Sequence, residues 1–396
     1  MRKFLSILTL FFLVTACIYP YTPDLHETPE DVLTVDANIT IGEASTVRLG
    51  TLYPIYDFTG FEYKDLTTSV VWVEDDAGNT YEGVLDRTSG SYYGYDYFDT
   101  SSPVFTIPTD KAPQDRRYRL VIEAMGNTYS TDWNDLSNPP SIRNIEFMAD
   151  NESVNVCVTV DGGEDATGYL LLSYDETWEF HVDYVPMYEV NTNNWSITQA
   201  LSGDYSKYWC WRYLDNKRTF PIDYTALSTS GITSYPLFSF ARSDNRNHRR
   251  YCVNLKAQSI SRETYRFLNN LETSSSGGDN LFTPNPGDIP SNLHCESDPE
   301  RSVLGYVVFS KTVSKRGWLD SRYLAPRHSY LPLVYITQDK YPEYYASGYL
   351  PLAENTKDSA SRSDDEGDYG WGSPRCYDCT ANGGTLKRPS YWDEME

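Results

Sequence analysis

The chain has 396 residues, more than one hydrophobic core usually serves, so its length predicts two domains. Its 56 Asp and Glu outnumber its 33 Lys and Arg, which gives a formal net charge of −23. Such an acidic surface repels phosphates and excludes nucleic-acid binding as a function class. Tyrosine is unusually frequent, with 34 residues against 15 Phe, and suits half-buried sheet faces and adaptable binding surfaces.

The N-terminus has the order of a secretory signal. Two basic residues precede an apolar run from Phe4 to Val14, which ends in small residues followed directly by Cys17. The run is shorter than the about 20 residues that cross a membrane. Val-Thr-Ala-Cys resembles a bacterial lipobox, in which the cysteine receives a lipid and the chain is cut before it. We therefore expect a lipoprotein signal peptide over residues 1–16, a lipid on Cys17 and an extended tether over residues 17–30; an ordinary signal peptide is the alternative.

Residues 31–137 contain short runs in which apolar and polar side chains alternate. Asp76–Asn79 and Met125–Asn127 supply the Gly and Asn that hairpin turns favour. About seven short strands over a hundred residues are typical of an immunoglobulin-like β-sandwich, although the Cys-Trp-Cys core of antibody domains is absent. The clearest predicted strands are 32–40, 45–49, 69–73, 80–85, 104–107 and 118–124.

A tyrosine cluster occupies residues 89–99 of this predicted sandwich. Tyr, Ser and Gly together are typical of antibody-type contact loops, so Tyr92, Tyr93, Tyr95 and Tyr97 are candidate ligand contacts. The alternative is a hairpin bent at glycine, whose tyrosines alternate across a sheet. The period-2 spacing of the last three tyrosines favours the hairpin.

Consecutive prolines in Asn138–Pro140 mark the predicted domain boundary, because proline stiffens a linker and cannot join a central strand. We expect a larger β-rich domain over residues 138–396 with one short helix. Ser261 can cap this helix, which runs to about Leu271. The predicted strands of this domain are 154–160, 168–178, 180–190, 236–241, 251–257 and 303–311. The fold class is therefore mainly β.

The sequence carries no signature of a known catalytic site, such as a nucleophile elbow, a zinc-protease helix or a phosphate loop. Its five histidines lie in unrelated contexts. Two of its many carboxylates can still meet in the fold as a hydrolase pair. The basic run Arg246–Arg250 predicts either an anion site or a solvated hairpin edge that discourages strand pairing, and we favour the edge.

Six cysteines remain when Cys17 is set aside, and an even number in an exported chain suggests disulfides. The last two have the spacing of zinc ligands, but a structural zinc site needs a second pair. Pro374 and the glycines after residue 382 predict a loop around this pair rather than the helix start of a redox pair. We expect no metal and no cofactor. The disulfide candidates are Cys157, Cys210, Cys252, Cys295, Cys376 and Cys379.

Two sets of motifs resemble one known family. The first set comprises Tyr251–Leu255, the helix after it, Leu281–Pro286 and Val303–Val307. The second is the Cys376–Cys379 pair with the closing Trp392. Together with the lipobox and the early Val-Asp-Ala-Asn-Ile-Thr strand, these motifs resemble the DUF4249 family of Bacteroidota lipoproteins over nearly the whole mature chain.

The resemblance implies an accessory lipoprotein of the cell envelope, of a kind commonly encoded beside TonB-dependent outer-membrane receptors. It supplies no catalytic residue. With this resemblance the C-terminal motif is interpreted as a staple, in which Trp392 packs as a plug. The bridges in this interpretation join Cys376 and Cys379 to Cys210 and Cys295, and Cys157 to Cys252.

We therefore expect a non-catalytic binding or accessory subunit, anchored by Cys17 to the outer membrane and displayed on the cell surface. Its expected partner is a TonB-dependent transporter in nutrient uptake. One alternative is a structural or adhesive subunit of the envelope. Another is a surface enzyme that hydrolyses glycans or peptides.

Overall fold

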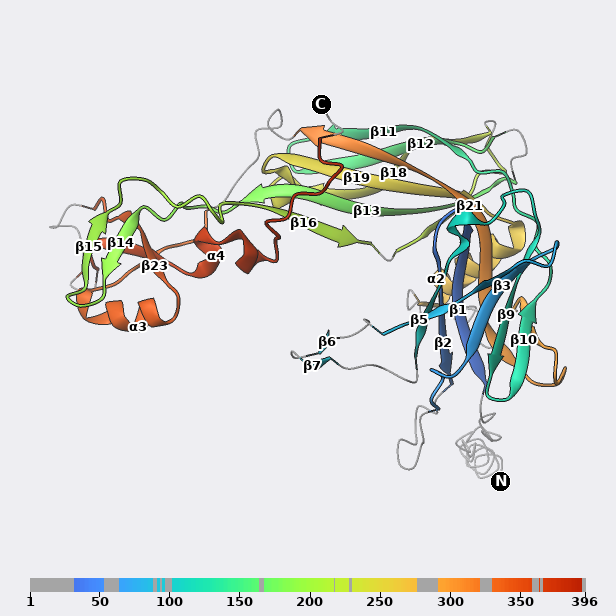
Figure 1. Cartoon of the computed structure of the whole chain (residues 1–396). Helices are drawn as coiled ribbons and strands as arrows, with labels where there is room; N and C mark the ends of the chain where they lie inside the picture. Colours follow the sequence, from blue (N-terminus) through green and yellow to red (C-terminus); the bar gives the residue numbers. More distant parts are fainter. Residues whose placement is uncertain are drawn as a thin grey trace, which may run out of the picture.

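Strands are the main regular element of the computed structural model, as the alternating sequence pattern predicts (Figure 1). Cys17, Tyr93 and Tyr97 lie outside the described residues. The structure describes residues 32–52, 64–87, 91–92, 95–96, 102–163, 167–216, 218–227, 230–275, 291–320, 330–357, 363 and 366–393.

One long strand, β21 (Val303–Asp320), joins the two halves of the molecule. It pairs in parallel with β1 (Leu33–Ile41) along its first half and antiparallel with β19 (Arg250–Ser259) along its second half. The result is one nine-stranded sheet in the order β16-β13-β19-β21-β1-β2-β8-β5, with β17 paired to β13. Its other strands are β2 (Ser45–Thr51), β5 (Val84–Asp86), β8 (Val104–Ile107), β13 (Tyr169–His181), β16 (Trp209–Asp215) and β17 (Phe220–Asp223).

A second sheet, in the order β20-β10-β9-β3-β4, closes the first core against β1, β2 and β8. Leu33, Ile39 and Ile107 are completely or almost completely buried in this core. Leu293 and Val307 belong to the same core, so the first sandwich also uses chain far beyond the boundary expected at residue 137. The strands of this sheet are β3 (Val70–Asp75), β4 (Thr80–Glu82), β9 (Tyr118–Ala124), β10 (Asn127–Thr131) and β20 (Leu293–Cys295).

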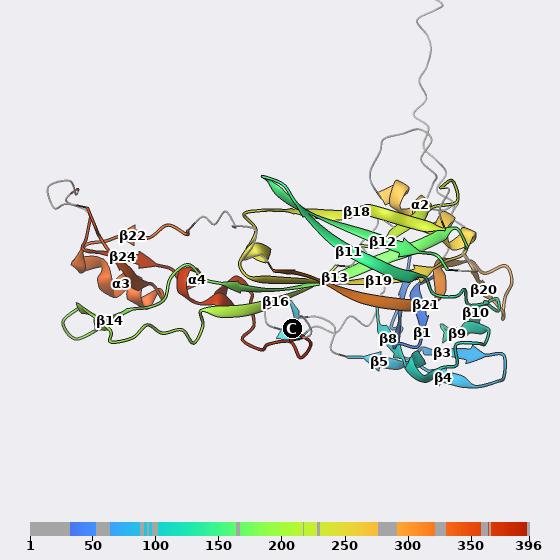
Figure 2. The ribbon, with the colours of Figure 1, turned by 90° about the horizontal axis from the view of Figure 1, so that it is seen from above.

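A third sheet, in the order β11-β12-β18, packs over β13 and β19 and forms the second core (Figure 2). The four alternate valines Val154–Val160 of β12 meet Val253 and Leu255 of β19 in this core. Side chains between these positions point to the opposite faces of their sheets. The strands are β11 (Ser141–Ala149), β12 (Ser153–Asp161) and β18 (Gly231–Ala241).

The helix α2 (Arg262–Ser275) begins where the sequence predicts. The hydroxyl of Ser261 accepts a hydrogen bond from the Thr264 amide at 3.1 Å, which satisfies one of the unpaired N–H groups of the first turn. Tyr265 stacks on Tyr169 of β13 with ring centroids 5.0 Å apart. In the described part of the chain, helices are too short or too polar to cross a bilayer.

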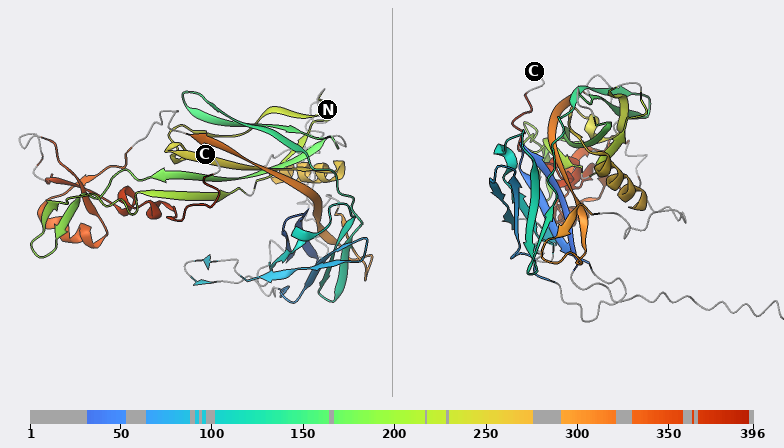
Figure 3. Two further views of the ribbon diagram at one scale, coloured as in Figure 1. Left: turned by 45° about the horizontal axis from the view of Figure 1, so that its top comes forward. Right: turned by 90° about the vertical axis from the view of Figure 1, so that its right-hand side faces the viewer.

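A distal module projects from the second sandwich (Figures 1 and 3). It combines the β14–β15 hairpin, the three-stranded sheet β22-β24-β23 and the helix α3. Trp371 and Tyr341 form its small core, on which Val190 and Ile197 of the hairpin pack. Its elements are β14 (Tyr188–Asn191), β15 (Ser196–Gln199), β22 (Val334–Tyr335), α3 (Tyr341–Ala346), β23 (Leu350–Glu354) and β24 (Tyr369–Gly372).

Part of the tyrosine cluster lies on a hairpin, as the favoured alternative predicts. β6 (Ser91–Tyr92) pairs antiparallel with β7 (Tyr95–Asp96), and Tyr92 lies opposite Tyr95.

Three expectations are corrected. The helices α3 and α4 (Pro374–Tyr377) join α2, so one helix was too few. Proline occupies the first turn of α4, where its missing N–H needs no partner, and Cys376 therefore lies on a helix rather than in a loop. The strand expected over 180–190 is interrupted, because β13 ends at His181 and β14 begins at Tyr188.

The close approach of β21 to β1 depends on the absence of a side chain at Gly305. Its φ is +125°, and a Cβ at this position would lie 1.9 Å from the carbonyl oxygen of Val35. We expect Gly305→Ala to lower the stability by roughly 3 kcal/mol or more, through backbone strain and overpacking, in urea denaturation followed by fluorescence.

Gly78→Ala is the matched control for Gly305→Ala. Gly78 also has a positive φ, +86°, but a Cβ there would meet no heavy atom within 4 Å. Its cost should be about 1 kcal/mol. Equal losses in the two variants would contradict the tight contact between β1 and β21.

Candidate functional site

The C-terminal segment, residues 376–393, wraps around β16, the edge strand of the large sheet. Cys379 forms a disulfide with Cys210 of β16. Beyond it, Thr385 and Trp211 exchange two backbone hydrogen bonds of 2.8 and 2.9 Å. Gly384 permits the crossing, because a Cβ there would lie 2.5 Å from the Cβ of Cys210. The segment is thereby fixed to β16 at three neighbouring points.

Trp392 ends this path on the other face of the sheet. It is 1% exposed and packs edge-on against Trp318 of β21, with ring centroids 5.1 Å apart. Its neighbour Tyr391 makes a hydrogen bond of 2.8 Å with Thr177 of β13. The predicted staple is thus confirmed for the bridge to Cys210 and for Trp392 as a plug.

The other two predicted bridges are wrong. Cys157, Cys252, Cys295 and Cys376 remain thiols in the structure. Cys295 belongs to the first core, whereas Cys376 lies on α4, beside Gly372 of the distal module. Cys157 and Cys252 alternate with core residues of β12 and β19, so they point away from the core on opposite sides of the second sandwich.

A pocket of about 390 Å³ lies between the C-terminal segment and the sheet. Part of its lining is a row of cross-strand neighbours, because Trp211 of β16 and Arg250 of β19 both lie opposite Glu179 of β13. We call this site the tryptophan–arginine pocket. It is lined by Glu179, Trp209, Trp211, Arg249, Arg250, Arg388 and Trp392.

Two donors hold the carboxylate of this pocket. Arg249 Nη1 donates to Glu179 Oε1 at 2.7 Å, and Trp392 Nε1 donates to Oε2 at 3.4 Å. Three guanidinium groups therefore line the pocket with one carboxylate that is hydrogen-bonded on both oxygens. Guanidinium groups bind carboxylate, sulfate and phosphate in planar, two-point geometry. The lining thus favours a ligand that carries negative charge.

Two tryptophans supply flat apolar surface beside these charges. Trp209 and Trp211 lie two residues apart on β16, so their side chains point to the same face at a spacing of roughly 7 Å. Both are half-buried. The Arg249 guanidinium lies 5.0 Å from the centre of the Trp209 ring, and Tyr208 meets that ring edge-on at 5.3 Å. These contacts fix the orientation of the Trp209 indole.

The rest of the basic run serves the second core. Arg246 binds the buried Glu176 through Nε at 2.9 Å and Nη2 at 3.1 Å, while the Tyr251 hydroxyl donates to Glu176 Oε1 at 2.6 Å. Burial and the Glu176 charge raise the pKa of Tyr251 well above its ordinary value, so the hydroxyl keeps its proton. The favoured solvated-edge interpretation is therefore wrong for Arg246, whose side chain is 19% exposed.

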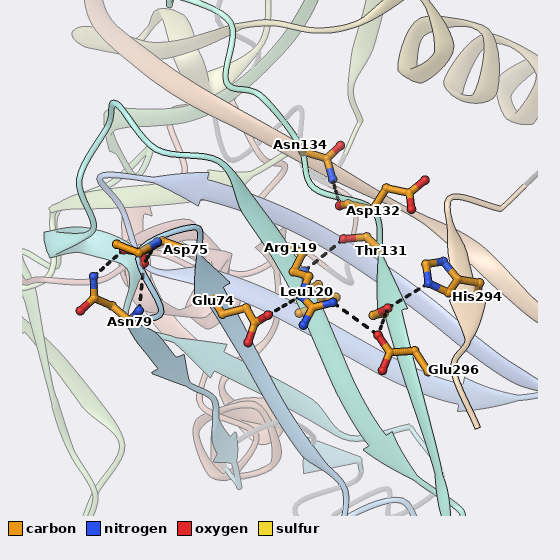
Figure 4. A network of polar contacts seen from close by, with 12 residues as sticks. Glu74, Asp75, Asn79, Arg119, Leu120, Thr131, Asp132, Asn134, His294 and Glu296 are labelled. Atoms are coloured by element: carbon orange, nitrogen blue, oxygen red, sulfur yellow. Dashed lines mark hydrogen bonds and ion pairs between the residues drawn. The ribbon is translucent and has the colours of Figure 1, made fainter.

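A second polar cluster lies in the first sandwich (Figure 4). The Ser130 hydroxyl donates to Glu296 Oε1 at 2.7 Å and lies 3.1 Å from His294 Nε2. Serine, histidine and a carboxylate form hydrolase triads, in which the histidine lies between the other two. Here the carboxylate accepts directly from the serine and is also 3.4 Å from Arg119 Nη1. Ser130 is completely buried, so this arrangement links β20 to β10 and does not present a nucleophile.

Sequence reasoning missed most of the pocket. Among the described residues, Trp392 alone of the residues named for the staple lines the pocket. A usable signal was the alternation Trp209-Cys210-Trp211, which turns both indoles away from the core side that holds the cysteine. Within the described ranges, His, Cys, Asp and Glu form no group of three that can hold a metal.

The Cys210–Cys379 bridge closes a loop with a sequence separation of 169. We expect its replacement by two alanines to lower the stability by about 3–5 kcal/mol and to make the C-terminal segment sensitive to limited proteolysis. Mass mapping of unreduced wild-type protein should recover one linked peptide pair with these two cysteines. Cys376→Ser is the control, since it should keep the linked pair. A wild-type map without the pair would contradict the bridge.

The comparisons with known proteins place this chain in a family. The family model described as a domain of unknown function, DUF4249, matches residues 18–316, which is more than half of the chain. The match includes β1 to β19 and most of β21, and it ends before the C-terminal segment that completes the pocket. No curated protein matches the chain. By the extent of the family match, the chain belongs to the DUF4249 family.

Proposed function

We propose that this chain is a non-catalytic binding subunit of a bacterial cell envelope of the Bacteroidota type, anchored to the outer membrane by a lipid on Cys17. In this proposal it works at the cell surface with a TonB-dependent transporter in nutrient uptake. The observation that carries the binding role is the tryptophan–arginine pocket. Its donors and flat rings suit holding a ligand, and its carboxylate already accepts two hydrogen bonds.

The surface of the distal module supports the proposal that the chain binds a protein partner. Large apolar side chains are exposed there and on the segment that leads to it, among them Leu201, Tyr205, Tyr330 and Val334. Leu201 is fully exposed, and Tyr205 and Tyr330 are more than half exposed. Apolar side chains gathered in this way mark protein interaction sites. The module lies at the opposite end of the molecule from β1, the first strand after the proposed anchor (Figure 1).

The anchor and the partner are tested together in cell envelopes. Cys17→Ala should remove the protein from the outer-membrane fraction, because no lipid can be attached. Ile18→Ala, which keeps the cysteine, is the control. Wild-type protein pulled down from detergent-solubilised outer membranes should bring a receptor barrel with it, and Leu201→Asp with Tyr205→Ser should weaken this co-purification.

Val84→Asp is the matched surface control for the pull-down, because Val84 is 69% exposed on the first sandwich. It should leave the co-purification unchanged. A wild-type protein that stays alone would contradict the transporter partnership and favour a structural or adhesive subunit. Retention of Cys17→Ala in the outer-membrane fraction would overturn the lipid anchor. Resistance of the protein to protease shaving of intact cells would overturn surface display.

The Ser130 cluster gives the hydrolase alternative a specific test. We expect no turnover in a screen of glycan and peptide substrates, because the hydroxyl is buried and bonded to Glu296. Ser130→Ala should lower the stability by about 1–2 kcal/mol through the lost hydrogen bonds. Turnover in wild-type protein that disappears in Ser130→Ala would instead establish an enzyme.

A further inference from the structure

We infer that the tryptophan–arginine pocket binds an acidic saccharide, with a sugar carboxylate on its arginines and a sugar ring on its tryptophans. This inference rests on the proposed binding function and names its ligand class. Three properties of the lining support this ligand class: its charge, its flat apolar surface and its construction.

Charge selects an anion. The pocket carries Arg249, Arg250 and Arg388 in a chain whose net charge is −23, so its positive lining runs against the character of the whole surface. Glu179 neutralises part of this charge through Arg249, and Asp393 pairs with Arg388. The side chains of Arg249 and Arg388 remain 38% and 47% exposed, so both can reach a ligand. A small anion gains these contacts, whereas a polyanion is repelled by the surrounding acidic surface.

Flat surface selects a ring. The indoles of Trp209 and Trp211 are wide and apolar, lie on one face of β16 and line the same pocket as the arginines. A pyranose ring presents a flat face of C–H groups that packs on an indole, while its hydroxyl groups stay in water or bond to polar neighbours. Trp209 and Trp211 are only half-buried, which suits a hydrated sugar better than an apolar ligand that needs enclosure.

Size and construction agree with a short saccharide. The volume of about 390 Å³ lies at the small end of ligand sites. The C-terminal segment brings Arg388 and Trp392 to the strands β13, β16 and β19 through the Cys210–Cys379 bridge and the pairing of Thr385 with Trp211. Fixed donors and rings bind with less loss of conformational entropy than mobile ones do. The disulfide therefore preorganises the pocket for its ligand.

The test is titration calorimetry on the full mature chain with two matched disaccharides, one that carries a single galacturonate residue and one with neutral galactose in its place. We expect the acidic sugar to bind, added salt to weaken it and the neutral sugar to bind at least about tenfold more weakly. Arg388→Gln and Trp211→Ala should each lower the affinity about tenfold. Arg116→Gln is the control, because Arg116 is also an exposed arginine paired with an aspartate but lies outside the pocket.

The calorimetry distinguishes a specific acidic-sugar site from a less selective one and from none. Unchanged thermal unfolding of the variants shows that a lost affinity comes from the pocket and not from unfolding. Equal affinity for acidic and neutral sugars would overturn the charge argument and leave a binding protein. Absence of binding to uronate, sulfated and phosphorylated sugars would overturn the ligand class. Neither result touches membrane anchoring or co-purification with a barrel, so failure of this inference is distinguishable from failure of the proposed function.

Discussion

The pairing of β21 with two different neighbours is the constraint on which the rest of the structure depends. Its first half completes the first sandwich beside β1, and its second half supports the second sandwich beside β19. The two halves are therefore joined within one continuous strand. Gly305 lets the backbone of β1 approach at the start of this path. The pocket strands β13, β16 and β19 therefore belong to the same continuous sheet as β1.

Local pattern predicted the strands but not their neighbours. Five strands lie within about two residues of their predicted bounds, namely β1, β2, β9, β12 and β19. Their alternation of apolar and polar side chains can be recognised from consecutive residues alone. β21 was expected to end near residue 311. Its second half contains the polar run Ser314, Lys315 and Arg316 and is extended because β19, a distant segment of the chain, pairs with it.

In the candidate site, too, local sequence pattern predicts which face of a strand a side chain lies on but not which distant residues it meets. The expected bridge between Cys157 and Cys252 overlooked the alternation along β12 and β19, in which the neighbouring valines and Leu255 mark the buried face and turn both cysteines away from it. By contrast, nothing near Arg249 in the sequence indicates Glu179 on another strand or Trp392 at the end of the chain. The sequence shows that residues 246–250 are basic, but only the fold shows that Arg246 forms an ion pair in the core whereas Arg249 and Arg250 line the pocket.

The parallel pairing of β1 with β21 also determines when the first sandwich can finish folding during synthesis. The ribosome makes β1 among the first strands and β21 among the last described ones. Until Val303–Lys311 is present, β1 has an open edge and the first core lacks Leu293 and Val307. Unpaired edges are aggregation-prone, and such long-range pairings form slowly. The first sandwich therefore cannot complete its folding as an independent N-terminal unit. A nascent chain that ends before β20 exposes this open edge and depends on chaperones.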